Sequence, residues 1–319
     1  MGEFDLIERF FKRPPRKADV GIGDDCAVWS PRAGHQLAFS ADMLVEGRHF
    51  LSTVEPSRLG HKALAVNLSD LAACGATPEA FLLSLSLPRA DEPWLSGFSQ
   101  GLFQLADAHG CELIGGDTTQ GPLNIAITVM GEVPVGQSIL RSGAQAGDDL
   151  YVSGHLGDAR LALEAFRGSV SLPQSVFDAA RMRMELPTPR VALGMALRGI
   201  AHAMADISDG LMGDLGHILK ASRVGAQIEL PLTQTLMQTT DIWDCPADLS
   251  MTCILSGGDD YELVFCAPAS ASAQVNAAAQ ASGTRVTRIG RITESQNLVL
   301  LNELGQSVHN PFRSFDHFA

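Results

Sequence analysis

The sequence lacks long apolar runs and paired cysteines. No segment reaches the roughly 18 consecutive apolar residues that a membrane-spanning helix needs, and the opening MGEFDLIERFFKR alternates charged with apolar residues, unlike a signal peptide. The six cysteines are scattered, with no C-x-x-C pair and no histidine at zinc-ligand spacing. These absences predict a soluble cytoplasmic protein with reduced thiols and no membrane partner.

Positive charge is also scarce. The chain has 36 acidic and 23 basic residues, a net charge of −13. Nucleic acids are bound mainly through clustered Lys and Arg, and the basic cluster here (Lys12, Arg13, Arg16 and Lys17) is interrupted by two prolines, which is typical of a solvated connector. The composition therefore argues against nucleic acid as a partner.

The common catalytic and nucleotide-binding motifs are missing as well. The sequence has no G-x-x-x-x-G-K-[ST], no complete G-x-G-x-x-G, no kinase H-R-D loop, no H-E-x-x-H and no G-x-S-x-G. P-loop, Rossmann and protein-kinase mechanisms therefore have no support from the sequence.

What the sequence does contain is an alternation of short β-rich runs with helical segments. A chain of 319 residues fits two domains of about 150 residues each, and the alternation predicts an α/β (α+β) fold. In the first half we expect strands at 35–42, 79–88, 111–116 and 123–133, and helices over 56–74 and 92–109. The polar stretch 134–148 predicts a junction, after which the alternation resumes; the domains are then 1–138 and 139–319.

Aspartates recur where apolar runs give way to polar residues, often beside Gly or Ser. They are Asp24, Asp25, Asp42, Asp70, Asp117, Asp206, Asp209, Asp259 and Asp260. No Lys or Arg lies within three residues of any of them, and a partly buried carboxylate needs a partner. Oxygen-only ligands suit hard cations, so these residues predict several Mg²⁺ ions gathered around a polyphosphate.

The alternative is that each aspartate is a turn residue or a helix N-cap. Asp158 and Asp209 both precede helical segments and have the sequence signature of caps. For a single aspartate this alternative is at least as good, but the recurrence at strand ends favours metal binding.

Two further residues have two interpretations each. Arg141, in ILRSGAQAGD, fits a bidentate contact to phosphate or an interdomain salt bridge equally well. His49, in VEGRHF, fits a substrate contact, although a hydrogen-bonded core histidine is the commoner role for such a residue taken alone.

Taken together, a series of motifs resembles the thiamine-monophosphate kinase family, within the aminoimidazole ribonucleotide synthetase-like (PurM-like) superfamily. The resemblance runs from residue 2 to residue 318, in order and at the family's spacing. The motifs are GEFDLIERFF, GIGDDCAV, SADMLVEGRHF, KALAVNLSDLAACGATP, LIGGDTTQGPL, RSGAQAGD, DISDGLMGDLGHILKAS, SGGDDYEL and FDHF.

The resemblance implies two tandem PurM-like domains and a homodimer formed through the N-terminal β-sheets. It implies transfer of the γ-phosphoryl group of ATP to thiamine monophosphate, giving thiamine diphosphate, the last step in making that cofactor. The implied transfer is direct and in line, with several Mg²⁺ ions and no covalent or general-base residue.

The resemblance also implies roles for individual residues. The metal-binding positions are Asp25, Ser40, Ala41 (through its carbonyl), Asp42, Asp70, Asp117, Asp206 and Asp209. The ATP-binding positions are Gly116, Asp117, Arg141 and Ser208, and the positions that hold thiamine monophosphate are His49, Asp259 and Phe315. The family commonly has Glu where this chain has Asp259, one methylene shorter.

Related functions on the same fold are less well supported. Selenophosphate synthesis needs a reactive Cys or selenocysteine in a Gly-rich segment ahead of the aspartates, and no Cys precedes Cys26. Hydrogenase-maturation relatives end in a modifiable Cys, whereas this chain ends FDHFA. A module that binds Mg-ATP without consuming it is the alternative from outside the enzymes.

Overall fold

The chain folds into two compact units, described here by a computed structural model that covers residues 2–314. Unit 1 comprises the residues up to 71 together with 76–136, and unit 2 comprises 72–75 together with the chain from 137 onward. Within residues 2–314, no helix has both the length and the apolar character to cross a membrane. The α/β class expected from the sequence is confirmed.

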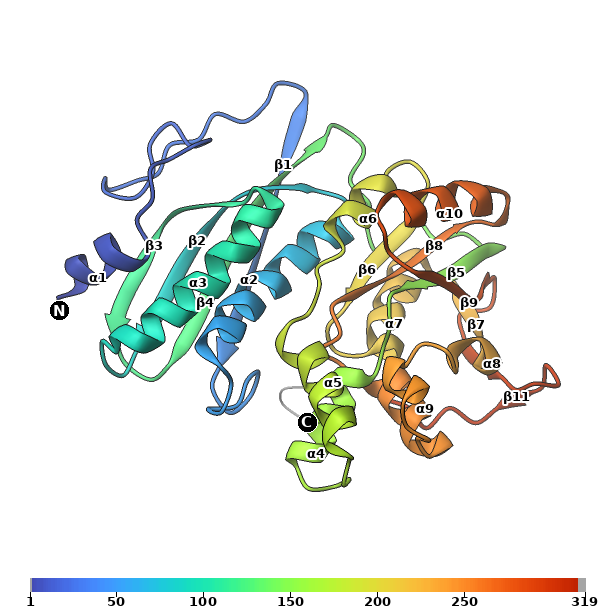
Figure 1. The fold of residues 1–319 in the computed structure, drawn as a ribbon. Helices are drawn as coiled ribbons and strands as arrows, with labels where there is room; N and C mark the ends of the chain where they lie inside the picture. Colours follow the sequence, from blue (N-terminus) through green and yellow to red (C-terminus); the bar gives the residue numbers. More distant parts are fainter. Residues whose placement is uncertain (1, 315–319) are drawn as a thin grey trace. The chain divides into compact units, whose positions relative to one another are not determined.

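Unit 1 is a four-stranded sheet with helices on one face (Figure 1). The sheet order is β1-β4-β2-β3, with β2 and β3 parallel and the other pairs antiparallel. Its strands are β1 (His35–Val45), β2 (Thr77–Leu87), β3 (Glu112–Gln120) and β4 (Asn124–Pro134). Its helices are α1 (Glu3–Phe10), α2 (Pro56–Ala73) and α3 (Glu92–His109).

The two faces of this sheet follow from the two-residue period of its strands. In β4, Ile125, Ile127 and Val129 are buried against the helices and alternate with half-buried residues. In β1 the opposite face carries large apolar side chains that stay exposed: Leu37, Phe39 and Met43. One face of the sheet therefore forms the core and the other presents apolar surface.

Helices α2 and α3 approach each other so closely that glycine is required at their crossing. A Cβ on Gly101 would lie 1.7 Å from the carbonyl oxygen of Ser57, and one on Gly60 would lie 2.0 Å from that of Phe98. Helix α3 ends at Gly110, whose left-handed φ of 59° is typical of a C-terminal glycine cap, as its sequence predicts.

Unit 2 is built on a seven-stranded sheet, in the order β11-β10-β7-β9-β5-β8-β6, in which only β10 and β7 are parallel neighbours. The strands are β5 (Asp148–Ser153), β6 (Ala203–Ile207), β7 (Gly225–Glu229), β8 (Glu262–Pro268), β9 (Val286–Thr293), β10 (Leu298–Leu301) and β11 (Ser307–Val308). The last three strands of this order, β5, β8 and the edge strand β6, are almost wholly buried.

The helices of unit 2 pack in groups. Helix α5 contacts α4, α4 contacts α9, and α9 contacts α7. Separately, α6 contacts α10 (Figure 1). They are α4 (Asp158–Phe166), α5 (Gln174–Glu185), α6 (Val191–Ala196), α7 (Leu211–Ser222), α8 (Leu230–Thr233), α9 (Ala247–Ser256) and α10 (Ser272–Ala281).

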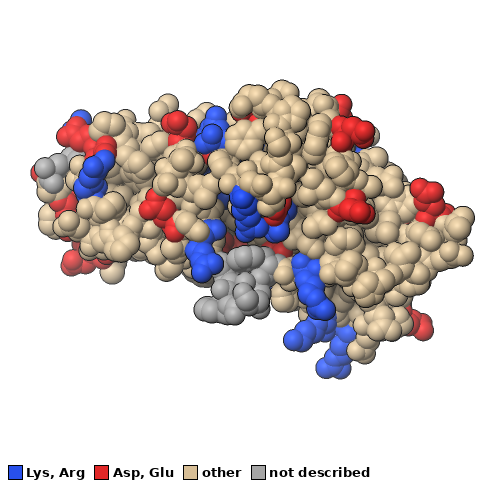
Figure 2. Space-filling view, turned by 90° about the horizontal axis from the view of Figure 1, so that it is seen from below, with Lys and Arg blue, Asp and Glu red and all other residues tan. Residues whose placement is uncertain are grey.

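The charged side chains do not form a single basic surface on the face shown in Figure 2. Lys and Arg occur there as separate groups, with Asp and Glu between them and wide uncharged areas around them (Figure 2).

Candidate functional site

The first part of the candidate site joins β1 to the end of α2. The Ser40 hydroxyl donates to the Asp70 carboxylate. The amide oxygen of Asn67 accepts the backbone N–H of Asp42 at 3.1 Å, while its Nδ2 donates to the Ala63 carbonyl at 2.9 Å. Asn67 is 1% exposed, so it holds β1 against the helix that carries Asp70.

Sequence reasoning missed Asn67, although a signal was present. It precedes Asp70 by three residues, a spacing that places two side chains on one face of a helix.

Ala41 lies between Ser40 and Asp42 and is exposed. Both β1 and β3 continue beyond the predicted ends, to Val45 and Gln120, so Asp42 and Asp117 lie inside strands rather than at strand ends.

Asp117 is on the opposite edge of the same sheet. Strands β4 and β2 separate β3 from β1, so three strand spacings, about 14 Å, lie between the two edges. Asp117 pairs with Ser84, which pairs with Ala126, which pairs with Met43. These four residues line a pocket of about 360 Å³ across the sheet.

Gly116 precedes Asp117 at a position that excludes any other residue. Its φ is 142°, and a Cβ there would lie 1.8 Å from the carbonyl oxygen of Leu83. The close approach of β3 to β2 therefore depends on this glycine.

Asp25 and His49 lie in turns at either side of β1. Asp25 is exposed, and its N–H donates to the Asp24 carboxylate at 2.8 Å. The ring of His49 accepts the Val45 N–H at Nδ1, 3.0 Å away. This bond places the ring proton of neutral His49 on Nε2.

In unit 2, the end of β6 meets the loop before β8. The N–H of Asp259 donates to the Ser208 carbonyl at 2.8 Å, and the N–H of Tyr261 donates to the Ile207 carbonyl at 2.9 Å. This extends the β6–β8 ladder and brings Ser208 and Asp209 beside Asp259. Asp206 is the buried fourth residue of β6.

The loop that carries Asp259 has a strained backbone. Asp259 and Tyr261 have φ values of 71° and 52°, a left-handed conformation that is uncommon for residues other than glycine. A Cβ on Gly258 would lie 2.3 Å from the Ser208 carbonyl oxygen. Such strain is frequent at functional sites, where surrounding contacts maintain it.

Asp214 shapes the turn that contains Ser208 and Asp209. Its carboxylate accepts the N–H groups of Ser208, Asp209 and Gly210, each at 3.1 Å. Burial raises the pKa of Asp214 to about 6. The prediction that Asp209 caps α7 is wrong, because the N-cap is Gly210. The turn is held instead by hydrogen bonds to Asp214, a residue of α7 itself.

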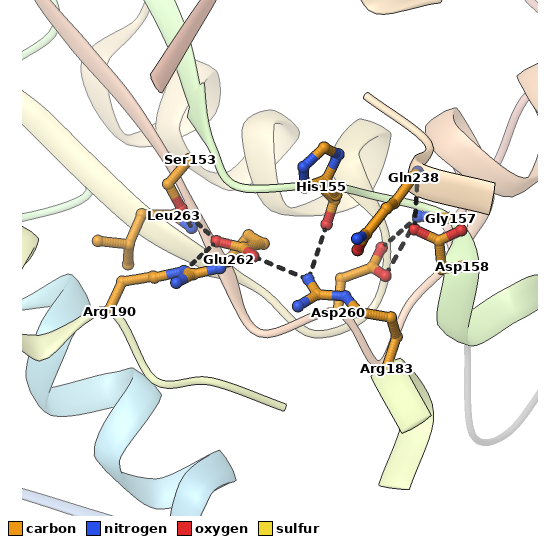
Figure 3. A network of polar contacts seen from close by, with 10 residues as sticks. All are labelled: Ser153, His155, Gly157, Asp158, Arg183, Arg190, Gln238, Asp260, Glu262 and Leu263. Carbon is orange, nitrogen blue, oxygen red and sulfur yellow. Dashed lines mark hydrogen bonds and ion pairs between the residues drawn. The ribbon is translucent and has the colours of Figure 1, made fainter. Parts of the chain in front are cut away.

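Below the strained loop, a buried network fixes the first residue of β8 (Figure 3). Glu262 is fully buried and accepts two bonds of 2.6 Å from Arg190, one of 2.9 Å from Arg183 and one of 2.6 Å from the Ser153 hydroxyl. Two guanidinium groups therefore compensate this carboxylate and anchor the strand that follows Asp259.

Two further carboxylates complete this network (Figure 3). Both oxygens of Asp260 accept the Gly157 N–H, at 3.0 and 3.1 Å, and burial raises the pKa of Asp260 well above its usual value. Asp158 accepts the N–H groups of Gln238 and Thr239 at 2.9 Å. The prediction that Asp158 caps α4 is therefore wrong: Gly157 is the N-cap, and Asp158 secures a distant loop.

Arg141 is exposed, and its carbonyl oxygen accepts the Ser222 hydroxyl at 3.3 Å. Both interpretations of its side chain, a phosphate contact and an interdomain salt bridge, stay predictions. Phe315 lies outside the described residues.

The predicted metal ligands suit Mg²⁺ by their chemistry, because all of them are oxygen donors. In the part of the chain that the structure describes, no three His, Cys, Asp or Glu side chains are close enough to hold a metal ion by themselves. An Mg²⁺ ion bound by these residues would therefore need water or phosphate oxygens to complete its coordination.

Comparison with known proteins identifies the family. The AIR synthase related protein N-terminal domain family matches residues 23–133, and the AIR synthase related protein C-terminal domain family matches 145–301. Thiamine-monophosphate kinase from Salmonella typhimurium is 41% identical over 325 residues, which cover 100% of this chain and 98% of the relative. The chain belongs to the thiamine-monophosphate kinase family. The thiamine-monophosphate kinase of Haemophilus influenzae is 42% identical, with the same two coverages.

Solved structures of the family have the same fold. Thiamine-monophosphate kinase from Stenotrophomonas maltophilia superimposes with a TM-score of 0.84 at 42% identity, covering 96% of each chain. The structure of AaThiL complexed with AMPPCP and TMP superimposes with a TM-score of 0.77 at 28% identity, covering 91% of this chain and 89% of AaThiL. The hydrogenase maturation protein HypE, at 19% identity and a TM-score of 0.77, shares the fold.

Proposed function

We propose that the chain transfers the γ-phosphoryl group of ATP directly to thiamine monophosphate, giving thiamine diphosphate and ADP. The observation that carries this proposal is the match to thiamine-monophosphate kinases over the whole chain at about 40% identity. The solved relative complexed with AMPPCP and TMP supports both substrates. The retained site residues in both units support the same reaction.

The chemistry asks the protein mainly for alignment. The attacking oxygen belongs to a phosphate monoester, which is largely ionised near neutral pH because its second pKa is about 6. A general base is therefore unnecessary, and in-line transfer depends on positioning and on charge neutralisation. Bound Mg²⁺ ions would supply that neutralisation by offsetting the repulsion between two anionic substrates.

The site residues divide among three tasks in this proposal. The metal ligands would be Asp25, Ser40, Ala41 through its carbonyl, Asp42, Asp70, Asp117, Asp206 and Asp209. ATP would contact Gly116, Asp117, Arg141 and Ser208, and thiamine monophosphate would contact His49, Asp259 and Phe315. The exposed guanidinium of Arg141 suits a phosphate contact, and Asp259 would be presented by its strained loop.

The same proposal includes the assembly of the protein. We place the domain boundary at 138/139, supported by the division between the units at 136/137. A homodimer formed through the N-terminal sheets is supported by the exposed apolar residues Leu37, Phe39 and Met43 of β1. We also place the enzyme in the cytoplasm, as the sequence predicts.

The first test is ³¹P NMR of the purified protein with ATP and Mg²⁺ and one of three acceptors: thiamine monophosphate, thiamine or thiamine diphosphate. We expect a diphosphate doublet from the monophosphate alone, ADP in equal amount, and no turnover in EDTA. Unchanged ATP would refute the proposal and favour a binding module. Conversion of ATP to AMP and phosphate would instead favour a related enzyme of the superfamily.

A further inference from the structure

The segment between α1 and β1, drawn in blue in Figure 1, crosses unit 1 without forming a helix. It carries Asp24 and Asp25 on a small hairpin that is closed by backbone bonds between Val20 and Val28. We call residues 19–28 the acidic hairpin. Its tip is exposed, so its position depends on how the chain is attached on either side of it. We call residues 16–18, which enter the hairpin, the first stem, and the chain at Arg32, which follows it, the second stem.

The first stem is bound by two buried glutamates of the sheet. The carboxylate of Glu112, on β3, accepts three successive backbone N–H groups: from Arg16 at 2.5 Å, Lys17 at 3.0 Å and Ala18 at 3.1 Å. The Lys17 ammonium bonds to Glu79, on β2, at 2.5 Å. The chain entering the hairpin is thus fixed by both its backbone and a charged side chain.

The second stem is bound in a similar way. Arg32 donates to Glu132, on β4, from its backbone N–H at 2.9 Å and from its Nε at 2.6 Å. Its Nη2 also donates to Glu79 at 2.7 Å. Glu79 therefore bonds to both stems, through Lys17 and Arg32, and closes the base of the hairpin.

Burial makes this attachment strong. Glu79, Glu112 and Glu132 are 6%, 7% and 1% exposed, and a buried carboxylate that loses its partner is far more costly than a broken surface ion pair. Apolar contacts fix the same segment, since Ala27 and Trp29 pack against the sheet. Buried glutamates on three strands of the sheet thus bind a segment that has little regular structure.

We propose that Glu79, Glu112 and Glu132, together with Lys17 and Arg32, are positioning residues that hold the acidic hairpin where Asp25 can bind Mg²⁺. This inference rests on the proposed function, because it takes Asp25 as a metal ligand. None of the five residues touches substrate in this scheme; each acts through the hairpin.

The test compares Arg32→Met with Arg288→Met. Arg288 is a matched control, because it also joins two carboxylates, Asp149 and Glu229, but lies in unit 2. We expect Arg32→Met to increase amide hydrogen exchange in residues 19–28 and to raise the Mg²⁺ concentration for half-maximal activity about tenfold, as for other groups that orient metal ligands. Turnover at saturating Mg²⁺ should recover.

One further measurement and two further variants make the test decisive. Electron paramagnetic resonance with Mn²⁺ and AMPPCP should show weaker ion binding for Arg32→Met and not for Arg288→Met. If Arg32→Met fails to fold, Lys17→Met replaces it in the test, with the same expected results. Arg32→Lys should restore part of the Mg²⁺ response.

The inference fails if Arg32→Met and Lys17→Met lower the melting temperature while hairpin exchange and Mn²⁺ binding match the wild type. It also fails if Arg288→Met changes Mn²⁺ binding to the same extent. Should the wild type not phosphorylate thiamine monophosphate, the proposed function fails separately, and hydrogen exchange and Mn²⁺ binding still decide the positioning role.

Discussion

Asp42 is held by its backbone, because Asn67 accepts its N–H. The carboxylate can therefore be neutralised without removing that contact. We expect Asp42→Asn and Asp117→Asn each to lower turnover about a hundredfold or more, as loss of a metal contact would, with the fold unchanged. Steady-state phosphorylation assays and circular dichroism would measure the two effects.

Asp178→Asn provides the control for these variants, since Asp178 is an exposed carboxylate on α5. Its turnover should equal that of the wild type. Full activity in Asp42→Asn or Asp117→Asn would contradict the assignment of that residue to metal binding.

Asp260 should make stability depend on pH. Because burial raises its pKa, the folded protein favours the protonated form, and this contribution is complete below the unfolded pKa and lost as pH rises through the folded pKa. Asp260→Asn cannot ionise. We expect its melting temperature to rise relative to the wild type as pH increases, measured by scanning calorimetry across mildly acidic to alkaline pH.

A constant difference in melting temperature between Asp260→Asn and the wild type across that range would show that Asp260 does not change its charge.

Glu132 should have the opposite effect on the pH dependence of stability. Burial tends to raise its pKa, but the bonds from Arg32 lower it overall. Its contribution is present above the unfolded pKa and lost as pH falls through the folded pKa.

At this scale the sequence indicated the aspartates but not their environments. The sequence pattern already singled out Asp42 and Asp70, whereas Asn67 and Asp214 were recognised only in the folded chain. Whether Asp158 caps its own helix or bonds to Thr239 depends on contacts 81 residues apart, which no local pattern records. Burial likewise distinguishes Asp260, which is 3% exposed, from its half-buried neighbour Asp259.

Among the helices, the crossing of α2 over α3 is the most demanding contact of unit 1. We expect Gly101→Ala to destabilise the protein by about 1–3 kcal/mol, as overpacked cores do, because the new methyl group would meet the Ser57 backbone. Urea denaturation followed by circular dichroism would measure the change in the free energy of unfolding.

Gly97→Ala is the matched variant on the same helix. Its Cβ would lie 3.1 Å from the Pro56 side chain, and alanine gains helix propensity of about 1 kcal/mol over glycine. Its stability should stay close to that of the wild type. If Gly101→Ala proved as stable as Gly97→Ala, the helices would have to separate easily at Gly101, and the prediction would be wrong.

Most helices and strands could be predicted from their periodicity, and their ends less well. Strand β1 continues past Asp42 because Met43, Leu44 and Val45 still pair with β4, although the charge suggested a stop. Helix α5 was missed despite buried residues at four-residue spacing, Val176, Ala180 and Met184. Strand order was beyond prediction, because pairing is set by long-range packing.

For the molecule as a whole, the apolar face of β1 predicts self-association. Phe39 is 61% exposed and shares this face with Leu37 and Met43, a row of apolar side chains that is unusual on a monomer. We expect the wild type to be a dimer and Phe39→Asp a monomer, measured by size-exclusion chromatography with light scattering.

Leu304→Asp is the control, because Leu304 is also exposed, at 78%, but lies in the turn between β10 and β11. It should remain a dimer. A monomeric wild type would remove the support that β1 gives to the proposed homodimer.

The two-domain organisation could be predicted from the repeated alternation and the polar junction. The arrangement of the site could not. Asp42 and Asp117 occupy similar positions in the sequence pattern, yet the strand order places them on opposite edges of one sheet. Only the completed sheet shows that Asp117 faces a pocket shared with Met43 and Ser84.

The four residues 72–75, which belong with unit 2 although they lie within the sequence of unit 1, bear on how the protein is made. Cys74 accepts the N–H of Ile139, and Gly75 accepts a bond from Arg198. During synthesis the ribosome must therefore add more than a hundred residues after Gly75 before Arg198 emerges. The first half of the chain therefore leaves the exit tunnel with the carbonyl of Gly75 still waiting for its Arg198 partner.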